Sequence, residues 1–313
     1  MLAYIARRLV ATIPTMLIVA LIVFSLLYFS AGDPAAIVAG DMATGDEIAQ
    51  IRARMGLDDP FLVRFADWVL AALQGDLGNS LYSNRPVTQL ILQRVEPTAV
   101  LTLTTMLLVI VVSVPLGVLA AWQAGRFADR AVMAFAVLGF SVPVFVVAYI
   151  LIWVFSVWLG VLPVQGYVSP FEDPVGAVRH MVLPSLALGL TLMALVSRIT
   201  RASMLDVLSQ DYIRTARAKG MAERPMLTRH ALKNAAVPIV TVIGLGVAML
   251  IGGVVITETV FAIPGMGRLT VDAILRRDFP VIQGVILVFS AVYVLINLLV
   301  DLSYCLFDPR IRY

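Results

Sequence analysis

The chain has 313 residues, of which 60% are hydrophobic and 14% charged, with a formal net charge of +3 and a mean hydropathy of +0.95. A soluble domain carries about 25% charged residues, so this composition excludes a water-soluble fold and predicts that the bilayer is the main solvent. The single Cys305 excludes a disulfide within the chain, and two histidines are too few for a histidine-based metal site.

Six apolar stretches are long enough to cross a bilayer, which needs about 20 residues. They cover residues 9–30, 99–122, 132–159, 182–204, 237–257 and 281–307. The first stretch is longer than the roughly 7–15-residue core of a signal peptide, so we expect a retained span. The sequence therefore predicts an all-α membrane protein with six transmembrane helices, formed by a single transmembrane domain over residues 1–313.

The distribution of Lys and Arg predicts the orientation, because short cytoplasmic loops carry the excess of basic residues. With the N-terminus inside, the inner segments hold 14 basic residues, eight of them in residues 197–236, and the short outer loops hold four. We therefore expect a multi-pass membrane protein with cytoplasmic N- and C-termini.

Residues 31–98 are predicted to form a helical periplasmic insertion between the first two spans. Thr44 and Glu47 have the spacing of a capping box, and we expect the helix that follows to end at Gly56. The insertion either packs on the spans or forms part of a docking surface for an outer partner.

Two more short helices are expected in this insertion. Asp59 followed by Pro60 is typical of an N-cap and a first helical position, and Gly75 is expected to end the helix that starts there. Another short helix should begin after Pro86, ahead of the second span.

The inner segment, residues 197–236, is longer than topology alone requires. A short helix is predicted from about Asp211 to Gly220, which would place Tyr212, Ala216 and Gly220 on one face. A narrow helix with a small-residue face suits insertion into a groove on another protein. The alternative is that the basic residues only fix topology and contact anionic head groups. The basic residues that flank this face are Arg214, Arg217 and Lys219.

Residues 211–220 read DYIRTARAKG, and residues 229–234 read RHALKN before Pro238. This pattern resembles the cytoplasmic coupling loop of ABC-importer permeases, and within them the dipeptide/oligopeptide permease family, which also includes nickel and glutathione importers. Arg214 and Thr215 stand where the general importer motif has Glu and Ala, whereas Ala216 and Gly220 match it. These departures are usual in the peptide branch.

Further motifs extend the resemblance over nearly the whole chain. They are GDP at 32–34, MGLD at 55–58, GDLGNS at 75–80, RPV at 85–87, ETVFAIPGMGRL at 258–269 and DPRIRY at 308–313.

The resemblance implies a permease that translocates short peptides together with a second, homologous permease subunit, two ABC ATPase subunits and an extracytoplasmic solute-binding protein. ATP and Mg²⁺ would be bound by the ATPase subunits, so no cofactor, catalytic residue or metal site is expected in this chain. The ATPase-coupling residues would be Tyr212, Arg214, Thr215, Ala216, Arg217, Lys219 and Gly220.

Two acids lie in or near the membrane, where acids are costly and usually face protein or water. We expect Asp301 to have a structural role near the inner interface, and Glu258 to anchor the outer loop that contains Pro264 and Gly265. That loop is our hypothesis for the mouth of the pathway, with Glu258, Phe261, Pro264 and Gly265 as outer-gate candidates.

Gly244, Ala248 and Gly252 recur every four residues and place small residues on one face of the fifth span. They are helix-packing candidates, either within this chain or as a seam against a second subunit or a moving gate.

Other transporter and enzyme classes fit less well. No lysine follows a glycine, so the chain lacks a P-loop for ATP. A secondary transporter would be expected to show an internal repeat and ionisable groups at the midplane. An intramembrane hydrolase would need a nucleophile beside a base, whereas His180 and His230 are expected on opposite sides of the membrane.

Overall fold

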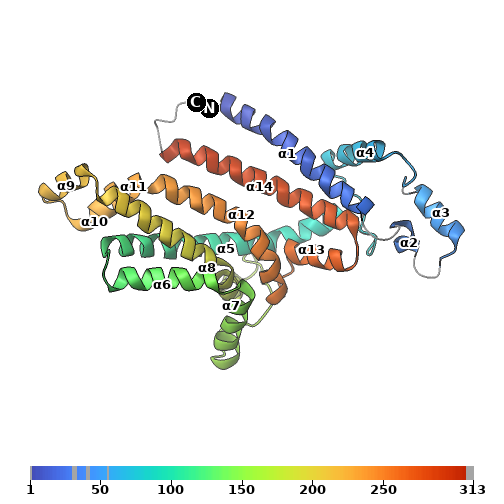
Figure 1. Ribbon diagram of the computed structural model, residues 1–313. Coiled ribbons are helices and arrows are strands. Elements are labelled where there is room, and N and C mark those ends of the chain that lie inside the picture. The colour runs from blue at the N-terminus through green and yellow to red at the C-terminus, as the bar shows by residue number, and fades with distance from the viewer. Residues whose placement is uncertain (1, 30–33, 40–42, 55, 308–313) are drawn as a thin grey trace. The chain divides into compact units, whose positions relative to one another are not determined.

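The computed structural model describes residues 2–29, 34–39, 43–54 and 56–307. Within these ranges the chain is helical, with one isolated antiparallel bridge between Asn79 and Pro86. Figure 1 labels the helices in chain order. Residues 32–33 and 308–313, which carry two of the family motifs, lie outside the described residues, as does the side chain of Asp301.

Four described helices are long and apolar enough to cross a membrane, and a shorter apolar helical stretch covers Val10–Ser25. Each predicted span at 99–122, 182–204, 237–257 and 281–307 lies inside one of the four long helices, so the prediction of helix there is confirmed. The four long helices are α5 (Val87–Trp122), α8 (Pro174–Leu208), α12 (Ala236–Val260) and α14 (Phe279–Phe307), and the shorter stretch lies in α1 (Leu2–Phe29).

The prediction of one continuous helix over residues 132–159 is wrong. The chain forms α6 (Phe127–Ser141), then α7 (Val144–Leu151) followed by a π-helix (Ile152–Trp158), and these two halves are bent by 107°. Pro143 lacks a backbone N–H and disfavours helical torsions at the residue before it, and Val142 is extended (φ −100°, ψ 124°). The pair counts as one broken span or as a re-entrant segment.

The chain divides into two compact units, residues 1–95 with 269–294 and residues 96–268 with 295–313. The first unit contains α2 (Pro34–Ala39), α3 (Gly45–Arg54) and α4 (Phe61–Leu73). The capping box before α3 is confirmed: the Thr44 backbone N–H donates to Glu47 Oε2 at 2.8 Å, which lowers the pKa of that carboxyl. Gly56 follows in the left-handed conformation (φ +61°), as expected for a helix stop.

Two predictions for the insertion are corrected. Asp59 is not the N-cap of α4, because Pro60 is itself extended (φ −54°, ψ 140°) and the helix begins at Phe61 without a side-chain cap. The short helix expected after Pro86 is not separate either. It is the first part of α5, which continues through Pro97 and Pro115 to Trp122. The expected end of α4 is confirmed, because Gly75 follows it at φ +85°.

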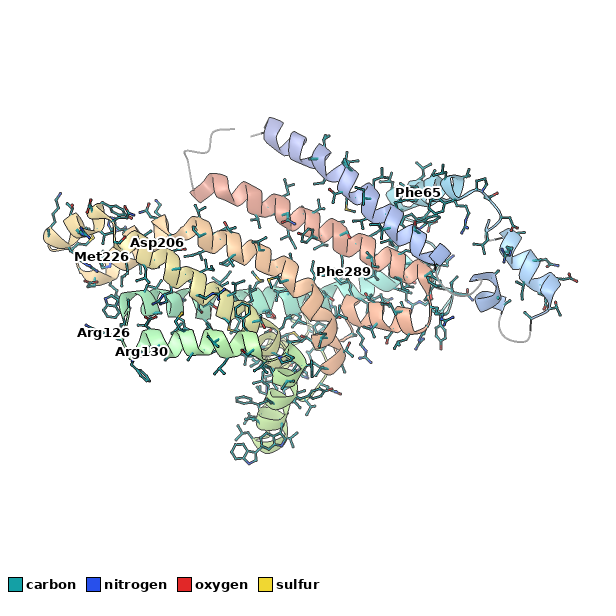
Figure 2. The ribbon with its side chains drawn as sticks, in the orientation of Figure 1. Phe65, Arg126, Arg130, Asp206, Met226 and Phe289 are labelled. Carbon is teal, nitrogen blue, oxygen red and sulfur yellow. The ribbon has the colours of Figure 1, made fainter. Side chains whose placement is uncertain are left out.

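Aromatic residues join α1 to α4 in the first unit. The Phe24 ring lies 5.5 Å from the rings of Phe61 and Phe65 and 5.4 Å from that of Trp68, measured between centroids. Figure 2 labels Phe65 within this cluster. Such aromatic pairs contribute about 0.5–1.5 kcal/mol each beyond the area they bury, so they hold the amphipathic α4 against the first apolar helix.

Helix α8 is the centre of the second unit and packs against α6, α7 and α12. Glycines permit the close contacts: a Cβ atom at Gly246 would meet Leu192, and one at Gly253 would lie 2.6 Å from Leu188 Cδ1. The predicted small-residue face divides, because a Cβ at Gly244 would meet Val300 on α14 whereas Gly252 has open space around it. Packing within the chain therefore explains Gly244 but leaves Gly252 uncovered.

Candidate coupling and gate sites

Helix α9 (Asp211–Ala218) confirms the short helix predicted in the inner segment. It ends in a Schellman motif: the Met221 N–H donates to the Ala216 carbonyl at 3.2 Å, and the Gly220 N–H donates to the Arg217 carbonyl at 2.9 Å. Gly220 has φ +79°, a torsion that a residue with a Cβ adopts only at a cost. The glycine therefore fixes where α9 ends and where the chain turns back.

A hydrophobic cluster on the inner side of the second unit holds α9 in place. Ile213 is 0% exposed and is the buried residue of α9. The other members of the cluster come from α5, α8, the segment after α9 and the start of α12, so Ile213 places the short helix in a core that these elements share. The buried members are Ala121, Met204, Ile213, Met226, Leu227, Ala231, Ala235 and Ile239. Met226 and Asp206 are labelled in Figure 2.

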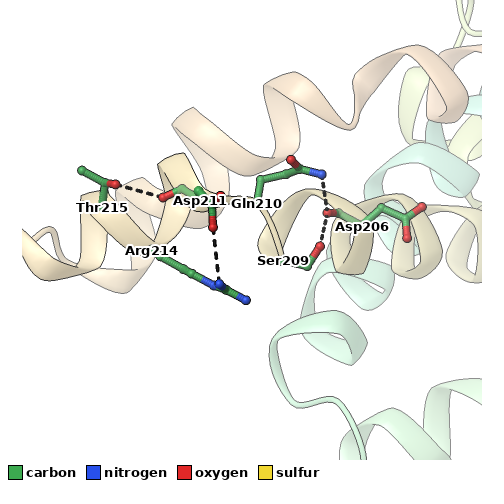
Figure 3. Close-up of polar contacts among 6 residues, drawn as sticks. All are labelled: Asp206, Ser209, Gln210, Asp211, Arg214 and Thr215. Carbon is green, nitrogen blue, oxygen red and sulfur yellow. Dashed lines mark hydrogen bonds and ion pairs between the residues drawn. The ribbon is translucent and has the colours of Figure 1, made fainter.

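The other side chains of α9 are turned to solvent. Tyr212 is 45% exposed, Ala216 is half-buried, and the three basic candidates are exposed. Figure 3 shows the local polar contacts: Arg214 Nη1 lies 3.3 Å from Asp211 Oδ1, and the Thr215 hydroxyl donates to the Asp211 carbonyl at 2.9 Å. These two contacts stay within one turn of helix, and Arg217 Nε lies 3.5 Å from Glu223 Oε1 in the segment after α9. All of these side chains are exposed, so the outer surface of α9 is available to another protein.

The inner segment begins later than predicted, because α8 continues without a break to Leu208 and includes residues that we assigned to the loop. One of them, Arg201, forms a bidentate ion pair with Asp129 at the start of α6, and the Asp129 side chain is only 5% exposed. The Gly125 N–H also donates to Asp129 Oδ2 at 2.9 Å. Figure 2 labels the neighbouring Arg126 and Arg130. This ion pair joins the start of α6 to α8, and Arg201 lies ten residues before the start of α9.

Glu258 lies in a closed polar cage near the end of α12 and is 0% exposed. The Thr98 hydroxyl donates to Glu258 Oε1 at 2.5 Å, and the Arg268 backbone N–H donates to Oε2 at 2.9 Å. Gly265 and Gly267 close the cage, because a Cβ on either would collide with the carboxyl group. The structure therefore brings Glu258 and the Pro264–Gly265 turn together, as the sequence predicted.

A second loop covers this turn. The Gly166 N–H donates to the carbonyl of Phe261, which is buried, at 2.9 Å. The Tyr167 hydroxyl donates to Glu96 Oε1 at 2.7 Å, and burial together with this hydrogen bond raises the pKa of the Tyr167 phenol. Ser169 donates to the same Glu96 oxygen at 2.6 Å. The 160–173 loop is thus fixed to α5 and to the turn after α12.

Several residues that build these sites escaped the sequence analysis. The sequence gives only a weak signal for two of them. Thr98 is a hydroxyl residue just before an apolar run, and Ile213 is one apolar residue inside a polar helix. Asp129 and Arg201 are 72 positions apart, and no local pattern pairs them.

Residues 113–313 match the family described as binding-protein-dependent transport system inner membrane component, and residues 1–104 match its N-terminal family. The chain is 53% identical over 310 residues to a probable peptide ABC transporter permease, y4tP, of Sinorhizobium fredii, covering 99% of each chain. It is 44% identical over 313 residues to the glutathione transport system permease GsiC of Salmonella choleraesuis, covering 100% of each.

A solved structure of the MetNI methionine ABC transporter in an inward-facing conformation shares the fold. Its TM-score is 0.58 at 18% identity, and the match covers 70% of this chain and 97% of that one. Full-length likeness to curated permeases and the family match agree with the apolar helices described above. The chain belongs to the dipeptide/oligopeptide branch of the binding-protein-dependent ABC transporter permeases, and it is a multi-pass protein of the bacterial inner membrane.

Proposed function

We propose that the chain is one permease subunit of an ATP-driven importer of short peptides. Its 53% identity to a probable peptide permease over 99% of both chains carries this proposal. The chain would form six spans with both termini in the cytoplasm, the α6–α7 pair acting as one broken span. Its partners would be a second, homologous permease subunit, two ABC ATPase subunits and an extracytoplasmic solute-binding protein.

In this proposal α9 docks on an ATPase subunit. Two observations support this docking. Ile213 is the one buried residue of α9, and the side chains of Tyr212 and Arg214 are exposed. The ATPases would bind ATP and Mg²⁺, and their closure would push on α9 and, through the cluster around Ile213, on α8 and α12. The spans would then alternate between outward and inward access.

We assign the outer gate to the turn after α12. The cage around Glu258 and the buried Phe261 favour a turn that moves as one rigid piece. Pro264 and Gly265 lie in that turn. Substrate released by the binding protein would pass between the two permease subunits beside it.

The test is uptake of a labelled dipeptide by cells with and without this chain, with unlabelled glutathione as competitor. Uptake that requires the chain and ignores glutathione supports a di- or oligopeptide importer. Chain-independent dipeptide uptake together with chain-dependent glutathione uptake would move the substrate to glutathione, which the 44% identity to glutathione permeases favours as the second candidate. Nickel, carried by other members of the family, is the third. Uptake that continues without ATP would contradict the importer and favour a secondary transporter.

A further inference from the structure

Two segments of the first unit, each expected on the outer side, meet at Asp278. Asp278 is buried, and it accepts a hydrogen bond from the Ser80 hydroxyl at 2.5 Å and another from the Leu81 N–H at 3.0 Å. The Ser83 N–H in turn donates to the Ser80 oxygen at 3.0 Å. We call the exposed surface over this contact, formed by residues 80–84 and 274–278, the outer platform.

The backbone of the outer platform has a fixed shape. Arg277 adopts a left-handed torsion, φ 56°, which a long side chain holds only at a cost, and Asn84, a residue type that tolerates this region, adopts φ 54°. The bridge between Asn79 and Pro86 closes the first segment, and the Asp278 N–H donates to the Ala273 carbonyl at 2.9 Å in the second. A preformed surface loses little conformational entropy when a partner binds to it.

Its side chains are those that protein interfaces favour. Tyr82 is 68% exposed and Leu275 is 77% exposed. The Arg276 guanidinium lies 4.1 Å from the centroid of the Tyr82 ring, which orders both side chains. Tyrosine and arginine are enriched among the residues that dominate binding energies, whereas most exposed side chains contribute little.

The charge of the outer platform has one sign. Arg276 and Arg277 are exposed, whereas the platform's single acid, Asp278, is buried. Two arginines among serine and asparagine make this surface costly to place in hydrocarbon, which favours a protein partner over lipid. A protein that complements the platform needs an acidic rim around a small apolar or aromatic centre.

We propose that the outer platform is a docking surface for an acidic face of the extracytoplasmic solute-binding protein. The inference rests on the proposed function, and it uses the family's dependence on a binding protein. Arg276 steers the approach of the binding protein, and Tyr82 with Leu275 forms the contact that remains when it has docked.

The experiment uses the assembled transporter in lipid nanodiscs. ATP hydrolysis is measured against the concentration of its cognate solute-binding protein, at low and at physiological salt. In Arg276→Glu the half-saturating concentration should rise about tenfold or more, corresponding to loss of one strong interface contact. Its salt dependence should weaken, because the attractive charge is gone. The rate at saturation should stay that of the parent.

Arg85→Glu is the matched control, because Arg85 is an exposed arginine nearby whose guanidinium donates to Gln93 Oε1 at 3.4 Å on α5. It should leave the half-saturating concentration within about twofold. Leu275→Gln, which adds no charge, should raise that concentration without changing its salt dependence.

Equal half-saturating concentrations in the parent, Arg276→Glu and Leu275→Gln would overturn the proposal, and the platform would then face lipid or the second permease subunit. If the parent itself shows no stimulation by any binding protein, the proposed importer function fails, and that result is distinct from failure of the platform alone.

Discussion

Thr98 joins Glu258 to the turn that follows it. Its hydroxyl donates to Glu258 Oε1 at 2.5 Å and accepts the Met266 backbone N–H at 2.8 Å. One side chain on α5 therefore satisfies a buried acid on α12 and a buried N–H at the start of α13 (Met266–Leu275). The outer turn and the two helices are fixed at a single oxygen.

Thr98→Val keeps the shape of this side chain and removes its hydroxyl. The Glu258 oxygen and the Met266 N–H would both lose a partner while buried, which costs about 1–3 kcal/mol for each such group. Thermal unfolding of the purified complex should therefore begin at a lower temperature. Thr98→Ser, which retains the oxygen, is the control and should unfold close to the parent. A Val variant as stable as the Ser variant would show that the hydrogen bonds contribute nothing.

Gly267→Ala should damage the turn by collision. The new Cβ would lie 2.7 Å from Val255 Cα and 3.0 Å from Glu258 Oε2, and the backbone atom cannot move aside. We expect reduced transport and reduced stability. Gly252→Ala is the matched control on α12, since its Cβ would meet nothing within 4 Å. The measurements are the unfolding temperature and the uptake rate of both variants. Equal values for Gly267→Ala and Gly252→Ala would contradict the predicted collision.

Glu258→Gln tests the acid itself. Glutamine keeps the length of the side chain but replaces one acceptor oxygen with an NH₂ group, so either the Thr98 hydroxyl or the Arg268 N–H would face a donor. We expect the complex to assemble while uptake falls. Assembly is measured by co-purification of the partner subunits, and full uptake in this variant would remove Glu258 from the gate.

Docking of α9 on an ATPase should be sensitive to bulk and charge at its small residues. Ala216→Glu or Gly220→Glu should leave ATP hydrolysis running while transport stops, because the docking face no longer fits its groove. Thr228→Glu, at an exposed position of the inner segment outside α9, is the control. The ratio of ATP hydrolysed to substrate transported is the measurement. Normal ratios in both α9 variants would show that this helix does not dock.

Asp129→Asn would break the ion pair between α6 and α8, in which the Asp129 side chain is 5% exposed and the Arg201 side chain 26% exposed. Removing the acid leaves a partly solvated Arg201 guanidinium without its counter-charge, which costs less than the about 3–5 kcal/mol of a fully buried pair. The stability of the complex should fall accordingly in chemical unfolding. Arg130→Gln, one residue along and exposed, should change stability by less than about 0.5 kcal/mol. A stable Asp129→Asn variant would mean that the pair has no structural role.

Local signals predicted local structure well in this chain. The capping box at Thr44, the glycine stops at Gly56 and Gly75, and the short helix that ends at Gly220 all depend on torsions and hydrogen bonds between near neighbours. Prediction was weaker where neighbours in sequence gave conflicting signals. Pro143 divides an apolar run that composition alone presents as one span, whereas Pro97 and Pro115 lie inside an unbroken helix.

The sequence by itself determined that this is a helical membrane protein, where the apolar cores of its four long helices lie, and to which permease family it belongs, because apolar length and local motifs carry that information. Only the tertiary structure decided which side chains meet. Thr98 and Glu258 are separated by 160 positions, Asp129 and Arg201 by 72, and Ser80 and Asp278 by 198. Such pairs form when helices pack, and the packing depends on close approach of the backbone at residues such as Gly246 and Gly265. These contacts join distant parts of the chain, so no periodic pattern in the sequence predicts them.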